Sequence, residues 1–280
     1  MSELLQHSVI ALLIASGFLG LLVGSFLNVV IYRLPLIIMA EWPENESGHT
    51  DQTVTLSHPR SFCPHCQHTI AWYDNLPLLS FLLLAGKCRK CRAKISRRYP
   101  LVEGLTACVS VICAWYFGYS LALIAALILS WGLIAQSFID LEHFILPDQI
   151  NLPLLWIGLL LSISGIFTNS HDSILGAAAG YLSLWSIYHL FKFLTGKEGM
   201  GYGDFKLLAL LGAWLGWQQL PIIIMLSSLI GSVFGIILIL HNRSGLNTPI
   251  PFGPYLAGSG WMALVFGDKL NAWYQSLLVL

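Results

Sequence analysis

The chain has 280 residues and no net formal charge, with 56% hydrophobic and only 10% charged side chains. Soluble globular chains carry about 25% charged residues, so this composition excludes an ordinary soluble domain and indicates a lipid environment. The neutral charge balance also gives no support to nucleic-acid binding.

Eight apolar stretches approach or exceed the length that crosses a bilayer, which is about 20 residues. The first has no basic start, so we expect a retained helix with its N-terminus outside rather than a secretory signal. The sixth is short and rich in glycine, as in a tilted or re-entrant segment. The sequence therefore predicts an all-α polytopic membrane protein with about eight transmembrane helices. The stretches lie near 8–32, 101–119, 121–139, 152–168, 174–194, 207–220, 221–240 and 252–267.

Lysine and arginine are concentrated between residues 33 and 100, which hold nine of the fourteen basic side chains. Cytoplasmic loops of membrane proteins are enriched in both residues. With this segment inside and eight alternating spans, only Lys269 among the basic residues lies outside. We therefore expect a first transmembrane helix at 1–32, a cytoplasmic module at 33–100 and a transmembrane core at 101–280. Within the module, residues 36–58 read as a flexible loop or, at their start, as an interfacial helix.

The module contains two C-x-x-C pairs, separated by 21 residues: Cys63 with Cys66, and Cys88 with Cys91. Two such turns can place four thiolates tetrahedrally around Zn²⁺, and the neighbouring cations favour the thiolate form. The alternatives are two disulfides or a redox pair, and a cytoplasmic location disfavours stable disulfides. The spacing therefore predicts a small zinc-ribbon-like domain with a closed, structural metal site.

Four other residues of these types have simpler interpretations. His65 and His68 could replace a cysteine ligand, although four thiols already complete the set. Cys108 and Cys113 lie five residues apart in the second apolar stretch. We expect both to be buried, apolar-like side chains rather than ligands.

Carboxylates near the membrane are costly and are therefore candidate functional groups. Asp140 ends the third apolar run, and Asp204 follows two glycines just before the sixth. The topology places both at the cytoplasmic edge, on separate helices. Two adjacent carboxylates share a proton, so one can activate water while the other protonates the carbonyl or the leaving amine. This is aspartic-protease chemistry, although Asp204 could also be a helix-start acid.

Glu142 and Asp148 lie in the same region as Asp140, and Asp148 reads as a turn residue after Pro147, also near a helix start. Position alone leaves both of them weaker candidates than Asp140 and Asp204.

Five blocks of the sequence resemble the prepilin peptidases, or type IV leader peptidases, which are intramembrane aspartic proteases of the GxGD kind. The resemblance implies that Asp140 and Asp204 are the catalytic pair and that Asp148 supports them. It also implies that the four paired cysteines bind structural Zn²⁺. The blocks are GSFLNVVIYRLP at 24–35, the cysteine segment at 60–107, FIDLEHFILPD at 138–148, GMGYGDFKLLALLGAWLGW at 199–217 and PFGPYLAGS at 251–259.

The resemblance further implies a substrate and a second activity. Such enzymes cleave the short basic leader of prepilins or of type II secretion pseudopilins, at the cytoplasmic face of the bacterial inner membrane. Members with four cysteines typically also methylate the new N-terminal amine with S-adenosylmethionine, so we expect both activities. No glycine-rich Rossmann motif marks a methyl-donor pocket. Glu103 is either a residue for substrate or methyl transfer, or an interfacial carboxylate paired with Arg97 or Arg98.

Two other classes of protein can be weighed against a protease. A proton-coupled transporter could use Asp140 and Asp204 as a relay, but such carriers often show inverted repeats and acids near the bilayer midplane. We find no repeat, and both acids map to the inner edge. A non-enzymatic scaffold of a secretion machine would leave the paired aspartates without a role.

Overall fold

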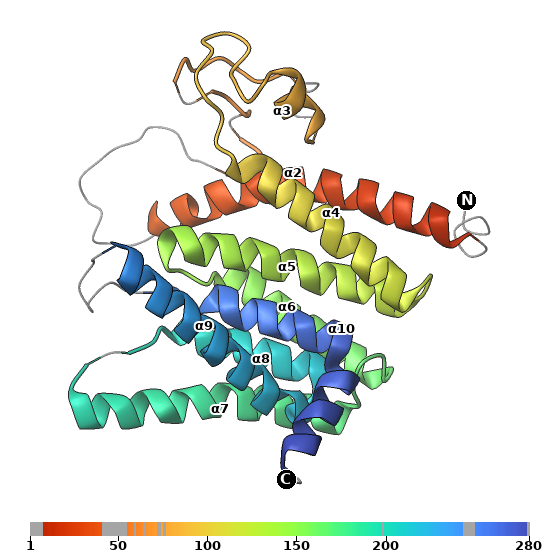
Figure 1. Cartoon of the computed structure of the whole chain (residues 1–280), viewed down its shortest axis with the longest axis vertical. Helices are drawn as coiled ribbons and strands as arrows, with labels where there is room; N and C mark the ends of the chain where they lie inside the picture. Colours follow the sequence, from red (N-terminus) through yellow and green to blue (C-terminus); the bar gives the residue numbers. More distant parts are fainter. Residues whose placement is uncertain are drawn as a thin grey trace. The chain divides into compact units, whose positions relative to one another are not determined.

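The computed structural model describes residues 8–40, 55–58, 60–63, 65–71, 74, 77–197, 199–242 and 250–278. Within these residues the chain is helical, with two isolated β-bridges and no strand. The chain divides into two compact units, Met1–Ala135 and Gln136–Leu280. Figure 1 shows the labelled helices of both units. The domain boundaries expected at residues 32 and 100 remain predictions.

The first unit contains α2 (Val9–Ala40), α3 (Leu79–Leu83), α4 (Arg98–Phe117) and the first part of α5 (Leu121–His143). α2 packs closely on α4 because glycines of α2 leave room for the backbone of its neighbour. A Cβ atom at position 24 would lie 2.7 Å from Cα of Glu103. Asn28 adds a hydrogen bond between the two helices, donating from Nδ2 to the carbonyl of Tyr99 over 3.1 Å.

The second unit is built around α8 (Tyr202–Leu215), whose side chains from Leu207 to Trp214 are all buried. α8 packs against α6 (Asp148–Ile163), α7 (Ser170–Thr195) and α10 (Gly253–Leu278), and α9 (Leu220–Asn242) packs against α10. The contact with α7 is close because Gly176 and Gly212 meet backbone to backbone. On the α6 side, Trp214 Nε1 donates to the carbonyl of Leu154 over 2.7 Å. The shortest α-helix of this unit is therefore the most enclosed one.

Eight helices of the described part, α2 and α4 to α10, fall on the eight predicted apolar stretches. Five segments are long and apolar enough to cross a membrane: α2, α4, α5, α7, and α9 with the turn before it. α6 has 16 residues and α8 only 14. At 1.5 Å per residue these reach about 24 and 21 Å, which is less than the ~30 Å of a hydrocarbon core. The helical architecture with several candidate membrane helices is confirmed for the described residues, and the number of eight crossings remains a prediction.

Two helix boundaries differ from the prediction. α2 continues through Pro35 to Ala40, so the suggested interfacial helix is, up to that residue, the end of the first helix. The remainder of the predicted loop up to residue 54 lies outside the described residues. α8 begins at Tyr202 rather than at Leu207, which places Asp204 inside its first turn.

Candidate active site and metal centre

The two predicted aspartates lie together in the second unit. Asp140 is in the last turn of α5 and Asp204 in the first turn of α8, with 6% and 7% of their surface exposed. Their carboxyl groups are close enough for the charges to repel each other. Local sequence sets the helix ends on which they lie: Phe144 takes a left-handed conformation and ends α5, and extended Gly201 precedes the first turn of α8.

Asp140 is held by a backbone group that is distant in sequence. The N–H of Gly253, at the start of α10, donates to Oδ2 of Asp140 over 3.0 Å. A Cβ atom at position 253 would lie 2.7 Å from the same oxygen, so a side chain there would displace the carboxyl group. Gly253 therefore fixes the orientation of the Asp140 carboxyl group. Sequence reasoning quoted this glycine in the PFGPY block but gave it no role.

Leu146, in the segment after α5, packs against the glycine before Asp204 and against Gly253 at the start of α10. A Cβ atom at Gly203 would lie 2.7 Å from Cβ of Leu146, and one at Gly253 would lie 3.1 Å from its Cδ2. Both glycines therefore allow the backbone to approach the same leucine side chain closely. This contact explains why glycine is required next to Asp204, a requirement that the GxGD pattern indicated without a cause.

Asp148 is the first residue of α6 and forms an ion pair with Lys206 of α8. Lys206 Nζ lies 2.7 Å from each oxygen of the Asp148 carboxylate. The pair is partly exposed, so its contribution to stability is at most about 1 kcal/mol. It connects the turn after α5 to the helix of Asp204, and Lys206 was not identified from the sequence.

Several buried polar atoms of the second unit have no hydrogen-bond partner among the described residues. They are Oδ1 of Asp204 and both amide atoms of Gln136 and of Asn151. Gln136 lies one helical turn before Asp140, on the same face of α5. Buried polar groups in proteins are almost always paired, with protein, water or ligand. Gln136 therefore adds a polar group on the side of α5 that carries Asp140, which the sequence did not indicate.

The four paired cysteines come together in the first unit. Their sulfur atoms all lie within 4.8 Å of one another, and Sγ of Cys63 is 3.8 Å from Sγ of Cys91. All four are free thiols. This cluster can hold a metal ion, as the spacing predicted.

The two cysteine turns have the same backbone design. The N–H of Cys63 donates to His68 over 2.9 Å, and the N–H of Cys88 donates to Ala93 over 2.8 Å. Gln67 and Arg92 each follow the second cysteine and take a left-handed conformation, with φ of 55° and 60°. An isolated β-bridge closes each turn. Each pair of sulfurs is thus positioned by its own short segment.

Hydrogen bonds from the backbone of Cys91 and Lys90 lower the pKa of the Cys88 thiol to about 6. The thiolate is the form that binds metal. Both histidines of the first turn, His65 and His68, are exposed and outside the cluster, so the cysteines form the set without them.

Three remaining candidates also lie in the first unit. Cys113 is buried, as expected, but the prediction that Cys108 is buried is wrong. Cys108 is exposed because it lines a groove between α2 and α4. Glu103 is buried, and its Oε2 accepts a hydrogen bond from the N–H of Leu78 over 2.8 Å. That contact joins α4 to the cysteine module and was not anticipated.

Comparisons with known proteins match most of the chain. Residues 18–117 match the bacterial peptidase A24 N-terminal domain, and residues 126–236 match the type IV leader peptidase family. A prepilin leader peptidase/N-methyltransferase from Stutzerimonas stutzeri is 50% identical over 279 residues, which cover 97% of this chain and 96% of the relative. Proteins with the same name from Aeromonas salmonicida (strain A449) and Pseudomonas aeruginosa are 53% and 50% identical, over 93% and 95% of this chain and 92% and 94% of the relatives. No solved structure matches the chain.

Proposed function

This chain belongs to the type IV leader peptidase family, and from that premise we propose that it cleaves the leader peptides of type IV prepilins, type II secretion pseudopilins or both. Asp140 and Asp204 perform the hydrolysis. The observation that carries this assignment is that two almost fully buried carboxyl groups from separate helices lie together in one unit. A transporter or a scaffold is disfavoured because the matched relatives are named as peptidases.

The hydrolysis uses one proton shared by the two aspartates. Oδ2 of Asp140 accepts the N–H of Gly253, so the proton does not sit on that oxygen. Oδ1 of Asp204 is buried without a partner among the described residues, which makes it the better donor. We assign Asp140 as the base that takes a proton from water, while Asp204 protonates the carbonyl oxygen. The water oxygen bonds to the carbonyl carbon as the C=O π bond opens, which gives a neutral gem-diol. Asp140 then passes its proton to the amide nitrogen while Asp204 takes back a proton from a gem-diol hydroxyl group. The C–N bond breaks, and the amine and the carboxylic acid are released.

The active site faces the cytoplasm of the bacterial inner membrane. Supporting this orientation, Lys192 and Lys197 lie at the C-terminal end of α7, and Lys206 lies two residues after Asp204 in α8. Basic residues are enriched on the cytoplasmic side. A substrate with an apolar helix behind its leader would reach the site laterally from the bilayer.

Cys63, Cys66, Cys88 and Cys91 would hold a Zn²⁺ ion in the first unit. Four thiolate ligands would leave no position for water, so the ion would supply folding free energy rather than catalysis. The second activity, methylation of the new N-terminal amine, follows from the relatives' printed names. S-adenosylmethionine would donate the methyl group, and no residue is assigned to it.

The test is cleavage of a purified prepilin by the protein in detergent or proteoliposomes, followed by mass spectrometry. Asp140→Asn and Asp204→Asn keep the shape of each side chain but remove the proton exchange. Each should slow cleavage at least about a thousandfold while zinc content and membrane insertion stay unchanged. With S-adenosylmethionine present, the wild-type product should be one methyl group heavier. Normal cleavage by either variant would refute the assignment of that aspartate.

A further inference from the structure

The short helix α3 of the cysteine module displays three leucines to the outside. Leu79, Leu82 and Leu83 are 59%, 74% and 81% exposed. The opposite side of α3 is occupied, since Ser80 is buried and Phe81 lies against Gly86. Contiguous exposed apolar side chains on a polar module indicate a surface that is covered by a partner or a membrane.

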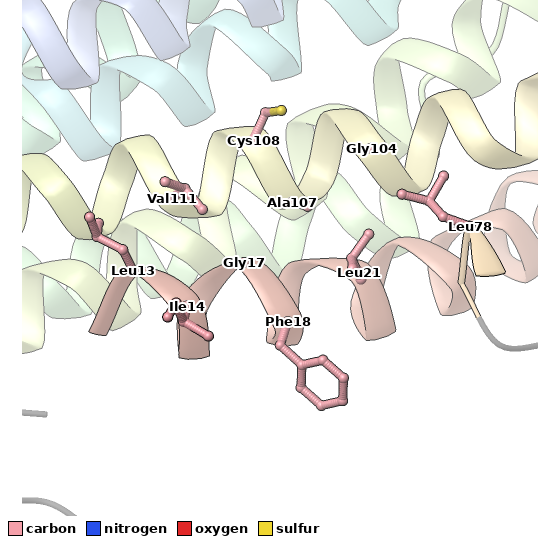
Figure 2. Close-up of a pocket in the computed structure, with 10 residues that line it drawn as sticks. All are labelled: Leu13, Ile14, Gly17, Phe18, Leu21, Leu78, Gly104, Ala107, Cys108 and Val111. Carbon is pink, nitrogen blue, oxygen red and sulfur yellow. The ribbon is translucent and has the colours of Figure 1, made fainter. Parts of the chain in front are cut away.

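Two contacts fix where α3 begins along α4. Leu78, the residue before α3, donates its N–H to Glu103 of α4 over 2.8 Å. Glu103 lies more than one turn into a helix that is itself a candidate membrane span. Leu78 also lines the groove between α2 and α4, beside Leu21 and Gly104, and Figure 2 shows it at one end of that groove. α3 therefore starts beside a part of α4 that is expected to lie within the bilayer, not beyond it.

The apolar surface of α4 continues onto α3. Leu101 and Leu105 each lie three residues before a residue that lines the groove beside Leu78, namely Gly104 and Cys108. Both leucines are exposed, as expected for side chains that face lipid in a membrane span. The groove lining is almost entirely apolar and includes Phe18 and Val111. The leucines of α3 thus extend a surface that already faces hydrocarbon.

The module around α3 is strongly basic. Between residues 60 and 98 the only acidic residue is Asp74, which is paired with Arg89. A divalent ion bound by four thiolates would leave the segment positive. Clusters of four to eight basic residues next to a transmembrane helix attract anionic lipid. The basic residues of the segment are Arg60, Lys87, Arg89, Lys90, Arg92, Lys94, Arg97 and Arg98.

We propose that α3 and the lysines after it form a membrane-docking surface that binds anionic phospholipid. Leu79, Leu82 and Leu83 enter the leaflet at which α4 begins, and Lys87, Lys90 and Lys94 contact the headgroups. The partner is a lipid surface because this segment carries apolar side chains next to cations. The segment is also held beside a candidate membrane helix. The cysteine module then rests against the bilayer instead of projecting into water.

The insertion of α3 is tested with the full-length protein in phosphatidylcholine vesicles containing phosphatidylglycerol. A Leu82→p-acetylphenylalanine variant accepts a hydroxylamine nitroxide and leaves all six cysteines intact. Collision of the label with O₂, which partitions into lipid, is compared with collision with a water-soluble Ni²⁺ complex. The control carries the same label through His65→p-acetylphenylalanine, in the exposed first cysteine turn.

The expected result is that O₂ dominates at position 82 and the Ni²⁺ complex at position 65. Equal access of the Ni²⁺ complex to both labels would place α3 in water and overturn the proposal. A label at position 82 shielded from both reagents would also overturn it, because a protein partner or a second copy would then cover α3.

The contact of the lysines with lipid headgroups needs a separate measurement. The Lys87→Gln/Lys90→Gln/Lys94→Gln variant should lose phosphatidylglycerol selectivity over phosphatidylcholine in native mass spectrometry. The expected loss is about fivefold for each lysine that contacts a headgroup. Lys269→Gln, which removes an exposed lysine of α10, is the matched control and should change nothing. If the triple variant keeps its zinc and its lipid selectivity is unchanged, the three lysines do not contact the headgroups and the proposed lipid binding is wrong.

Discussion

The cysteine cluster and the aspartate pair are assembled in opposite ways. Each cysteine pair is positioned within a few residues, by the hydrogen bonds and left-handed residue of its own turn. The aspartates are positioned by contacts between distant segments, of which Asp140 with Gly253 is the most separated. A site made of local turns tolerates change elsewhere in the chain, whereas a site made of helix ends depends on how the whole unit packs.

The largest expected effect is on the local site. Cys63→Ser removes a ligand from a closed shell, and structural zinc contributes about 10–16 kcal/mol to the folding of small metal-binding domains. The variant should lose its metal and expose the module to limited proteolysis, while cleavage per folded molecule falls much less. Zinc content and peptidase rate are measured on the same preparation.

Cys108→Ser is the control for that experiment, since Cys108 lies outside the cluster. Parallel loss of zinc and cleavage in well-folded Cys63→Ser protein would mean that the metal takes part in the reaction.

The next effect tests the long-range site. Gly253→Ala places a methyl group 2.7 Å from Oδ2 of Asp140, so the carboxyl group must turn away. A displacement of about 1 Å can cost about a hundredfold in rate. We expect a loss of that size in cleavage, with zinc content unchanged.

Gly258→Ala is the matched control on the same helix, because nothing lies within 4 Å of a Cβ atom there. If both alanine variants cleave at the wild-type rate, Gly253 does not position Asp140.

A smaller effect is expected at the ion pair between α6 and α8. Lys206→Met leaves Asp148 without the two 2.7 Å contacts. Because the pair is partly exposed, the free energy of unfolding should fall by at most about 1 kcal/mol, and cleavage by less than tenfold. The coupling is measured with a double-mutant cycle using Asp148→Asn.

Lys197→Met, at an exposed lysine beyond α7, controls for the loss of a charge. A coupling energy of zero would show that the pair does not connect the two helices energetically.

The smallest effect is within the cysteine module. The Arg89 guanidinium donates to Asp74 and lowers the pKa of that carboxyl group. The guanidinium is largely exposed, so Arg89→Gln should destabilise the zinc-loaded module by less than about 1 kcal/mol. Raising the salt concentration should shrink the difference between variant and wild type. A difference that persists in high salt would point to packing rather than charge.

These contrasts also explain what could be predicted from the sequence. The geometry of the metal cluster could be predicted from cysteine spacing alone, because a C-x-x-C turn is a local structure. The cysteines are Cys63, Cys66, Cys88 and Cys91. The helices were predictable for the same reason, since each is an apolar run of suitable length. The ends of the helices were harder to predict. α8 starts at Tyr202 because extended Gly201 and the packing of Gly203 on Leu146 allow a helix there. The spacing of apolar residues does not indicate this start.

The partners of the aspartates could not be predicted, again for a physical reason. A backbone donor such as Gly253 has no side chain to mark it, and its pairing with Asp140 depends on how α10 packs in the second unit. Lys206 appeared only as a basic residue near the inner edge until its contact with Asp148 was known. The burial of the Gln136 and Asn151 side chains likewise comes from packing, because a polar residue near a helix end can equally well face solvent.

The shortness of α8 has a consequence for the depth of Asp204. Its 14 residues span about 21 Å, so a bilayer of ordinary thickness exceeds it by about 9 Å. Neighbouring helices rather than lipid cover α8 from Leu207 to Trp214, so the protein itself makes up this difference. We expect the end that carries Asp204 to lie below the surface of the bilayer, where a substrate chain must bend inward before its peptide bond reaches the carboxyl groups.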